Sequence, residues 1–212
     1  MKQEINPEET TRAEAFSMWM SSPMPMVTLM KTFDVTRLVK FSKRTGMKFN
    51  TLLCWCIGKA AYAKEEFYLL PVDGKLFRYD SLAINVIVDN AKGGISSCDV
   101  PFSEDLRQFN SDYLALTAQA AKECRNTSLE ESMIIGTSAV VQTELDCIVN
   151  QYSGIFNNPF LVWGRYRKGF FRTTLPISFQ FHHALMDGAQ AASFLNDLQK
   201  AIESVGKAST RV

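Results

Sequence analysis

The chain has 212 residues, enough for one domain or at most two small ones and ample to bury a hydrophobic core. Its 23 Lys and Arg residues nearly balance 22 Asp and Glu residues, so the net charge of +1 does not point to nucleic acid or a membrane surface as a partner. No apolar run approaches the ~18 residues of a membrane span. The polar, acidic N-terminus is not typical of a signal peptide, and five irregularly spaced cysteines then indicate reduced thiols in the cytoplasm.

The first half of the chain alternates helical and strand patterns. Thr11, Arg12, Ala13 and Glu14 predict a capping box that opens a short helix through Trp19. The following expected elements are a strand over residues 26–33, a helix over 34–46, a buried helix over 51–64 capped by Asn50, and strands over 76–77, 81–88 and 95–100.

The second half continues the alternation. We expect a helix capped by residues 103–105 and running to about Lys122, a strand over 133–142, a hairpin of residues 161–166 and 170–183 across 167–169, and a helix over 189–202. Because helices and strands are interleaved along the chain, the sequence predicts an α/β fold, a two-layer sandwich with one large mixed sheet, over the single domain 1–212.

The only two histidines are adjacent, in the run His182-His183-Ala-Leu-Met-Asp187-Gly. The preceding residues alternate apolar and polar, which places His183 at the end of the apolar face of a strand and His182 on the polar face. Burial disfavours the imidazolium, so we expect a neutral His183 that can accept a proton near neutral pH. The alternative is a histidine with only a packing role.

A metal site is the second alternative for this run, since imidazole and carboxylate both suit zinc or iron. The chain has no further histidine. Cys54 and Cys56 would point about 200° apart on a helix, which favours core packing over a metal pair. The sequence therefore predicts no metal site.

The run matches the HHxxxDG signature of the chloramphenicol acetyltransferase family, and further matches extend from Arg12 to Gln199. The chain thus resembles this family, which belongs to the wider group of CoA-dependent acyltransferases. Peptide-synthetase condensation domains carry a similar signature. The resemblance implies an O-acetyltransferase with acetyl-CoA as cosubstrate and no permanently bound cofactor. It also implies direct transfer to a small hydroxylated acceptor, with His183 as general base.

The resemblance assigns further residues to the reaction. Ser138, in Gly136-Thr137-Ser138, matches the strand serine that donates to the charge of the tetrahedral intermediate. Arg12 matches the arginine that pairs with the motif aspartate, here Asp187, and fixes the site. From its composition alone, Ser138 would be a structural hydroxyl and Arg12 a solvated residue.

CoA binding is expected at Lys48, Arg165 and Tyr166, which match the family positions for the 3′-phosphate and the adenine. Arg165 also lies in the densest basic cluster of the chain, with Arg167, Lys168 and Arg172. The alternative is a solvated hairpin tip. The resemblance further implies a homotrimer with shared active sites, whose contact would be lined by the aromatic residues Trp19, Phe156, Phe160 and Trp163.

The acceptor pocket differs from the family pattern. Trp19 replaces a tyrosine and Val162 replaces a threonine, while Gly136 stands where the family has asparagine. Chloramphenicol is one expected acceptor, because the residues matched to the acyl transfer itself are retained. The alternatives are transfer to another alcohol, an amine or a thiol, and an inactive family member that binds a small molecule or a partner.

Overall fold

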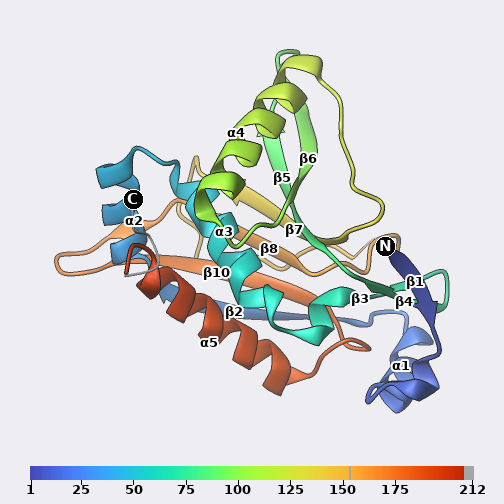
Figure 1. Cartoon of the computed structure of the whole chain (residues 1–212). Helices are drawn as coiled ribbons and strands as arrows, with labels where there is room; N and C mark the ends of the chain where they lie inside the picture. The colour runs from blue at the N-terminus through green and yellow to red at the C-terminus, as the bar shows by residue number, and fades with distance from the viewer. Residues whose placement is uncertain (153, 208–212) are drawn as a thin grey trace.

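The structure, a computed structural model, describes residues 1–152 and 154–207 and is built on a large mixed sheet (Figure 1). The strand order is β2 (Met26–Asp34), β10 (Thr173–His182), β8 (Phe160–Gly164), β7 (Met133–Val140), β5 (Leu82–Asp89) and β6 (Ile95–Pro101), and the short β9 (Arg167–Lys168) pairs with β10. The pairs β5–β7 and β7–β8 are parallel, and the others are antiparallel. The predicted mixed sheet is confirmed.

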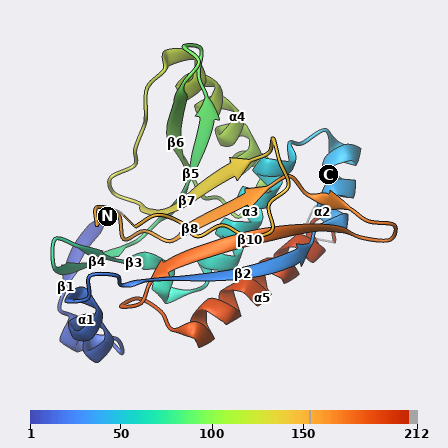
Figure 2. The same ribbon diagram turned by 180° about the vertical axis from the view of Figure 1, so that it is seen from behind.

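Four helices cover one face of this sheet (Figures 1 and 2). They are α2 (Thr36–Thr45), α3 (Phe49–Tyr62), α4 (Leu106–Glu123) and α5 (Gly188–Ser204). The expected positions of these helices are confirmed to within a few residues. Among the described residues no helix lies across the opposite face, which Figure 2 views directly.

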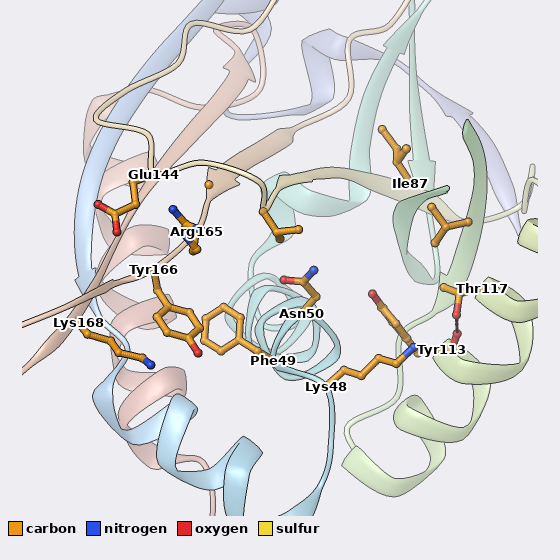
Figure 3. Close-up of a pocket in the computed structure, with 13 residues that line it drawn as sticks. Lys48, Phe49, Asn50, Ile87, Tyr113, Thr117, Glu144, Arg165, Tyr166 and Lys168 are labelled. Atoms are coloured by element: carbon orange, nitrogen blue, oxygen red, sulfur yellow. Dashed lines mark hydrogen bonds between the residues drawn. The ribbon is translucent and has the colours of Figure 1, made fainter. Parts of the chain in front are cut away.

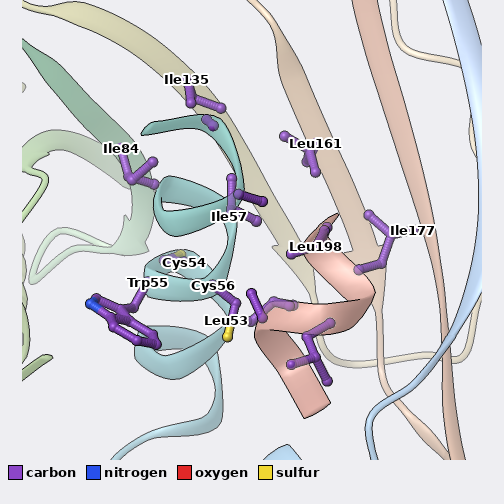
Figure 4. Close-up of a cluster of buried hydrophobic side chains, with 14 of the residues drawn as sticks. Leu53, Cys54, Trp55, Cys56, Ile57, Ile84, Ile135, Leu161, Ile177 and Leu198 are labelled. Atoms are coloured by element: carbon purple, nitrogen blue, oxygen red, sulfur yellow. The ribbon is translucent and has the colours of Figure 1, made fainter. Parts of the chain in front are cut away.

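The core forms where α3 and α5 pack side by side against the sheet (Figure 4). Helix α3 is apolar on nearly every side, and all but four of its residues are buried. Figure 4 shows its residues Cys54 and Ile57 beside Ile84, Ile135 and Leu161 of the central strands. Both Cys54 and Cys56 are buried at 1% and 0% exposure. These cysteines are therefore core residues, as predicted. Their burial raises the pKa of the Cys54 thiol to about 12.

A second, three-stranded sheet was not predicted. It has the order β1 (Lys2–Ile5), β4 (Lys75–Tyr79), β3 (Leu69–Val72), and all its pairs are antiparallel. Strand β1 was not predicted, because none of its residues is fully buried and its sequence therefore lacks an apolar alternation. This sheet and α1 (Ala13–Met20) lie at the end of the large sheet where β10 finishes (Figure 1).

Helix capping followed the sequence only in part. Asp105 caps α4 by accepting from the N–H groups of Arg107 and Gln108, as expected. The predicted capping box at Thr11 is wrong, because Arg12 occupies the N-cap of α1 without a side-chain cap. The predicted Asn50 cap is also wrong. Asn50 lies inside α3, and its side-chain oxygen accepts from the Trp163 indole N–H at 3.3 Å.

Within residues 1–152 and 154–207, no helix combines the length and hydrophobicity needed to cross a bilayer. The same residues contain no cluster of three or more His, Cys, Asp or Glu side chains arranged to hold a metal ion.

Candidate active site

Arg12 ties the start of α1 to the corner between β10 and α5. Its guanidinium forms a bidentate ion pair with Asp187, with Nη1–Oδ2 at 2.7 Å and Nη2–Oδ1 at 2.9 Å. It also donates to the carbonyl oxygens of His183, at 2.7 Å, and Ala184, at 3.1 Å. The Arg12 side chain can reach this corner because it leaves the chain just before the first turn of α1. One guanidinium therefore fixes the backbone that directly follows the imidazole, while the His183 N–H donates to the Pro25 carbonyl oxygen at 2.8 Å on the other side.

Asp187 is the N-cap residue of α5, and its backbone N–H donates to the Gln190 side chain at 2.7 Å. The hydrogen bond from Arg12 is the main cause that holds the pKa of Asp187 below its usual range, so the carboxylate stays ionised at neutral pH. The ion pair is only half-buried in the single chain. The Arg12 side chain is 11% exposed, whereas Asp187 is 51% exposed.

The two histidines exchange the environments predicted for them. His182 is the buried one, at 1% exposure, and its Nδ1 accepts the Ala184 N–H at 3.1 Å. Burial lowers the pKa of His182 to about 4, so this ring is neutral. His183 lies beyond the end of β10, and its side chain is 27% exposed. The predicted desolvation of His183 is wrong because β10 is buried on both faces, so alternation does not separate a wet face from a dry one.

His183 is held between an aromatic ring and a carboxylate. The indole of Trp19 stacks flat against its imidazole, with ring centroids 4.3 Å apart and the planes 6° from parallel. Its Nδ1 lies 3.3 Å from Oδ1 of Asp187, yet it makes no well-aligned hydrogen bond within the described residues. Because Nδ1 faces Asp187, Nε2 is the nitrogen at the opposite edge of the ring. Trp19, expected in the acceptor pocket, is thus in direct contact with His183.

Ser138 does not meet His183 within one chain. Ser138 on β7 pairs with Val162 on β8, which pairs with Ser178 on β10, five residues before His183. At ~3.3 Å per residue and ~4.8 Å per strand, the two residues are about 19 Å apart. The family resemblance led us to expect both in the reaction, but the fold puts them at different positions on the sheet.

Lys48, Arg165 and Tyr166 line one cavity of about 730 Å³ (Figure 3). Lys48 precedes α3 and extends toward α4, while Arg165 and Tyr166 directly follow β8. The Tyr166 ring packs on Phe49 with centroids 5.1 Å apart. The cavity also adjoins the end of β7 at Val141, three residues beyond Ser138.

The charge of the cavity is mainly positive. Lys48, Arg165 and Lys168 line it against a single carboxylate, Glu144. Two other members of the basic cluster do not line the cavity, although Arg167 lies 3.5 Å from the cavity residue Glu144. Arg167 binds Asp146 at 2.7 Å, and Arg172 lies 3.7 Å from Asp34. The predicted cluster therefore divides into cavity residues and paired surface residues.

Several cavity residues were not predicted as site residues. Tyr113 and Thr117 come from α4, and Ile87 from β5. Their sequence patterns show only an amphipathic helix and a buried strand, so no local signal separates them from core residues. Asn50 could have been suspected because it is one of the few polar residues of α3.

Val162, the second expected acceptor residue, is 5% exposed. Residues Leu145–Ile148 lie over it and over Ser178, and the space left between them is negligible. Within one chain Val162 therefore does not border an open pocket.

Comparisons with known proteins agree over most of the chain. The sequence model described as chloramphenicol acetyltransferase matches residues 3–199. Chloramphenicol acetyltransferase 2 of Escherichia coli is 26% identical over 202 residues, covering 92% of this chain and 94% of that protein. A chloramphenicol acetyltransferase of Clostridium perfringens is 25% identical over 208 residues, covering 95% and 99%.

Solved structures share the fold. A chloramphenicol acetyltransferase superposes with a TM-score of 0.82 at 19% identity, covering 95% of this chain and all of that one. A probable dihydrolipoamide acetyltransferase from Listeria monocytogenes gives 0.67 at 14% identity, covering 99% and 97%. At these identities the structural likeness bears on the fold alone.

Proposed function

Because the chain belongs to the chloramphenicol acetyltransferase family, whose members are acetyl-CoA-dependent O-acetyltransferases, we propose that one domain over residues 1–212 acetylates a small hydroxylated acceptor with His183 as its general base. The observation that carries the proposal is the corner fixed by Arg12. Nη2 of Arg12 donates to the His183 carbonyl oxygen at 2.7 Å, while Trp19 stacks on the imidazole and Asp187 faces its Nδ1. A partly exposed imidazole held in one orientation is suited to accept a substrate proton.

The proposed reaction is a direct transfer. Nε2 of His183 takes the acceptor hydroxyl proton as the oxygen attacks the thioester carbonyl. A C–O bond forms, and the Ser138 hydroxyl donates to the negatively charged oxygen of the intermediate. The C–S bond then breaks, and His183 returns the proton to the leaving sulfur of CoA. The thioester is already activated, so no covalent enzyme intermediate and no permanently bound cofactor is needed.

The cavity lined by Lys48, Arg165 and Tyr166 is proposed to bind CoA. Its three cations suit the phosphates, and Tyr166 offers a ring face to the adenine. Arg165→Ala should reduce the affinity for CoA about tenfold or more, and should abolish the preference for CoA over 3′-dephospho-CoA in calorimetric titrations. The matched control is Arg172→Ala, because Arg172 is 77% exposed beside Asp34 and does not line the cavity. Equal binding of both ligands by the unaltered protein would contradict this assignment.

A homotrimer with active sites shared between copies is proposed because one chain is incomplete. His183 and Ser138 are about 19 Å apart by strand register, too far to act on one substrate carbonyl. The exposed Val149, Ile155 and Phe156, at 71%, 73% and 70%, offer apolar surface for such a contact. The expectation that Trp163 lines this contact is wrong, because Trp163 is 1% exposed and belongs to the core.

Chloramphenicol is the acceptor proposed first, with a cytoplasmic location and a role in antibiotic resistance as consequences. A different small alcohol, amine or thiol is the second candidate. It is favoured by Trp19 stacking on His183 and by the buried Val162, which both alter the surface that an amphenicol would meet.

The test is thiol release from acetyl-CoA with chloramphenicol and a panel of other alcohols, amines and thiols, with the acetylated product identified by mass. We expect release with at least one hydroxylated acceptor and none above background in His183→Ala. Release with other alcohols but not with chloramphenicol would support the second candidate. A folded protein that binds CoA and acetylates nothing would instead be an inactive family member.

A further inference from the structure

The ring of Phe160 lies directly on Gly136. The register of β7 and β8 pairs these residues. A Cβ atom on Gly136 would lie 2.6 Å from Cε2 of Phe160 and would also overlap Cδ2. Gly136 does not have a positive φ, so backbone freedom does not require glycine here. The glycine is needed because any side chain would displace the ring.

This ring and Ser138 share the face of the sheet without helices. The intervening Thr137 points toward α3, since its hydroxyl lies 3.9 Å from Sγ of Cys54. Side chains alternate along a strand, so Gly136 and Ser138 both face the opposite way, and their Cα atoms are about 7 Å apart. Phe160 is partly exposed. An acceptor that reaches Ser138 would therefore meet the Phe160 ring.

The two polar side chains that face Phe160 and Gly136 across the sheet are already engaged, while the Oδ1 atom of the neighbouring Asn150 is buried without a partner among the described residues. Gln180 faces Phe160 from β10, and its amide donates to Asn150 at 3.0 Å and to Thr28 at 3.4 Å. Asn85 flanks Gly136 on β5 and donates to Asp99 at 2.7 Å. The surface next to Ser138 is thus a flat hydrocarbon ring where the family pattern has an asparagine.

We propose that Phe160 determines acceptor specificity by selecting alcohols that carry an aromatic ring over alcohols that present a hydrogen-bonding group at this place. An aryl group can stack on the Phe160 ring or meet it edge to face. An amide or hydroxyl at the same position would lose its water, while the side chains of Gln180 and Asn85 already have other partners. The inference rests on the proposed acetyl transfer next to Ser138.

The experiment compares 2-phenylethanol with N-acetylethanolamine, an alcohol that carries an amide. In Phe160→Ala, kcat/KM for 2-phenylethanol should fall about tenfold or more, chiefly through KM, while the value for N-acetylethanolamine changes by less than about threefold. Binding of CoA should be nearly unchanged, because Phe160 does not line the CoA cavity. The control Phe170→Ala removes a phenylalanine that is 95% exposed in the turn after β9 and should alter neither acceptor.

A second pair of variants tests the steric argument. Gly136→Asn alone should destabilise the fold, whereas Gly136→Asn combined with Phe160→Ala should recover stability and shift preference toward the amide acceptor. An acceptor ratio that stays the same in Phe160→Ala, from an enzyme that does acetylate alcohols, would overturn the inference alone. Failure of the unaltered protein to acetylate any alcohol would overturn the proposed function, and this inference with it.

Discussion

At the scale of single residues, the adjacent histidines divide into a buried one and a partly exposed one, which is the proposed base. His182 is buried and accepts a backbone hydrogen bond from Ala184, while His183 is partly exposed and stacked on Trp19. The order of the two in the signature is explained by where β10 ends. The last strand residue is enclosed, and the first residue of the turn is free to face a substrate.

Replacing His183 by alanine should lower turnover at least ~100-fold, the usual scale for a positioned base, and leave CoA affinity unchanged. The cavity of Lys48, Arg165 and Tyr166 does not include His183, so binding and chemistry should separate. Steady-state kinetics and CoA titration measure the two effects. Near-normal turnover in this variant would exclude His183 as the base.

His182 should make the fold sensitive to mild acid. Its pKa is about 4 in the folded chain against an ordinary value of 6.5, so between these pH values the unfolded chain binds a proton that the folded chain does not. The contribution of His182 to stability is therefore present above pH 6.5 and is lost as pH falls toward 4. The full loss amounts to roughly 3 kcal/mol.

Thermal melts from pH 7.5 to 4.5 check this prediction against His182→Asn, whose side-chain oxygen can still accept the Ala184 N–H. As pH falls across this range, the melting temperature of the unaltered protein should decrease more steeply than that of His182→Asn. The ionised carboxylates of Asp34, Asp187 and Asp197 have lowered pKa values, so their contribution is lost mainly below pH 4. Parallel curves for the two proteins would show that His182 does not control acid sensitivity.

At the scale of elements, the site depends on how α1 meets the start of α5. Arg12 and Asp187 are 175 positions apart in sequence, and the guanidinium of Arg12 links both elements to the end of β10. The sequence places each residue near a helix start, but neither start reveals the other as its neighbour.

Asp187→Asn should lower the free energy of unfolding by roughly 1–3 kcal/mol, between the values for exposed and buried ion pairs, because Asp187 is half-exposed. Turnover should fall as well, since the corner that orients His183 loosens. Denaturant melts and kinetics measure both effects. Asp146→Asn is the control, because Asp146 is 91% exposed in its pair with Arg167 and its loss should change little. An unchanged melt with lost activity would assign Asp187 a direct role in the chemistry.

At the scale of the whole molecule, one chain carries its proposed catalytic groups at separate places on the sheet. Residues His183 and Ser138 can act together only if two copies face each other. A cyclic assembly meets this need, because each copy then contributes one group to each of two sites.

Co-refolding inactive His183→Ala and Ser138→Ala chains in equal amounts tests this arrangement. Half of the positions supply an intact His183 and half an intact Ser138, so about a quarter of the sites should regain both groups. Activity should recover to about that fraction, and sedimentation should give three times the chain mass. Activity that stays at the average of the two variants, or a fully active monomer, would rule out shared sites.

The sequence by itself determined the fold class, most element positions and the residues proposed for the chemistry, because periodicity and the HHxxxDG run are local properties of the chain. The tertiary structure decided which histidine is buried, that Trp19 stacks on His183, that Phe160 requires Gly136, and that Tyr113 lines the cavity with Lys48. These depend on contacts between segments far apart in sequence. Strand alternation cannot report burial for a strand covered on both faces, and no local pattern states which strands become neighbours.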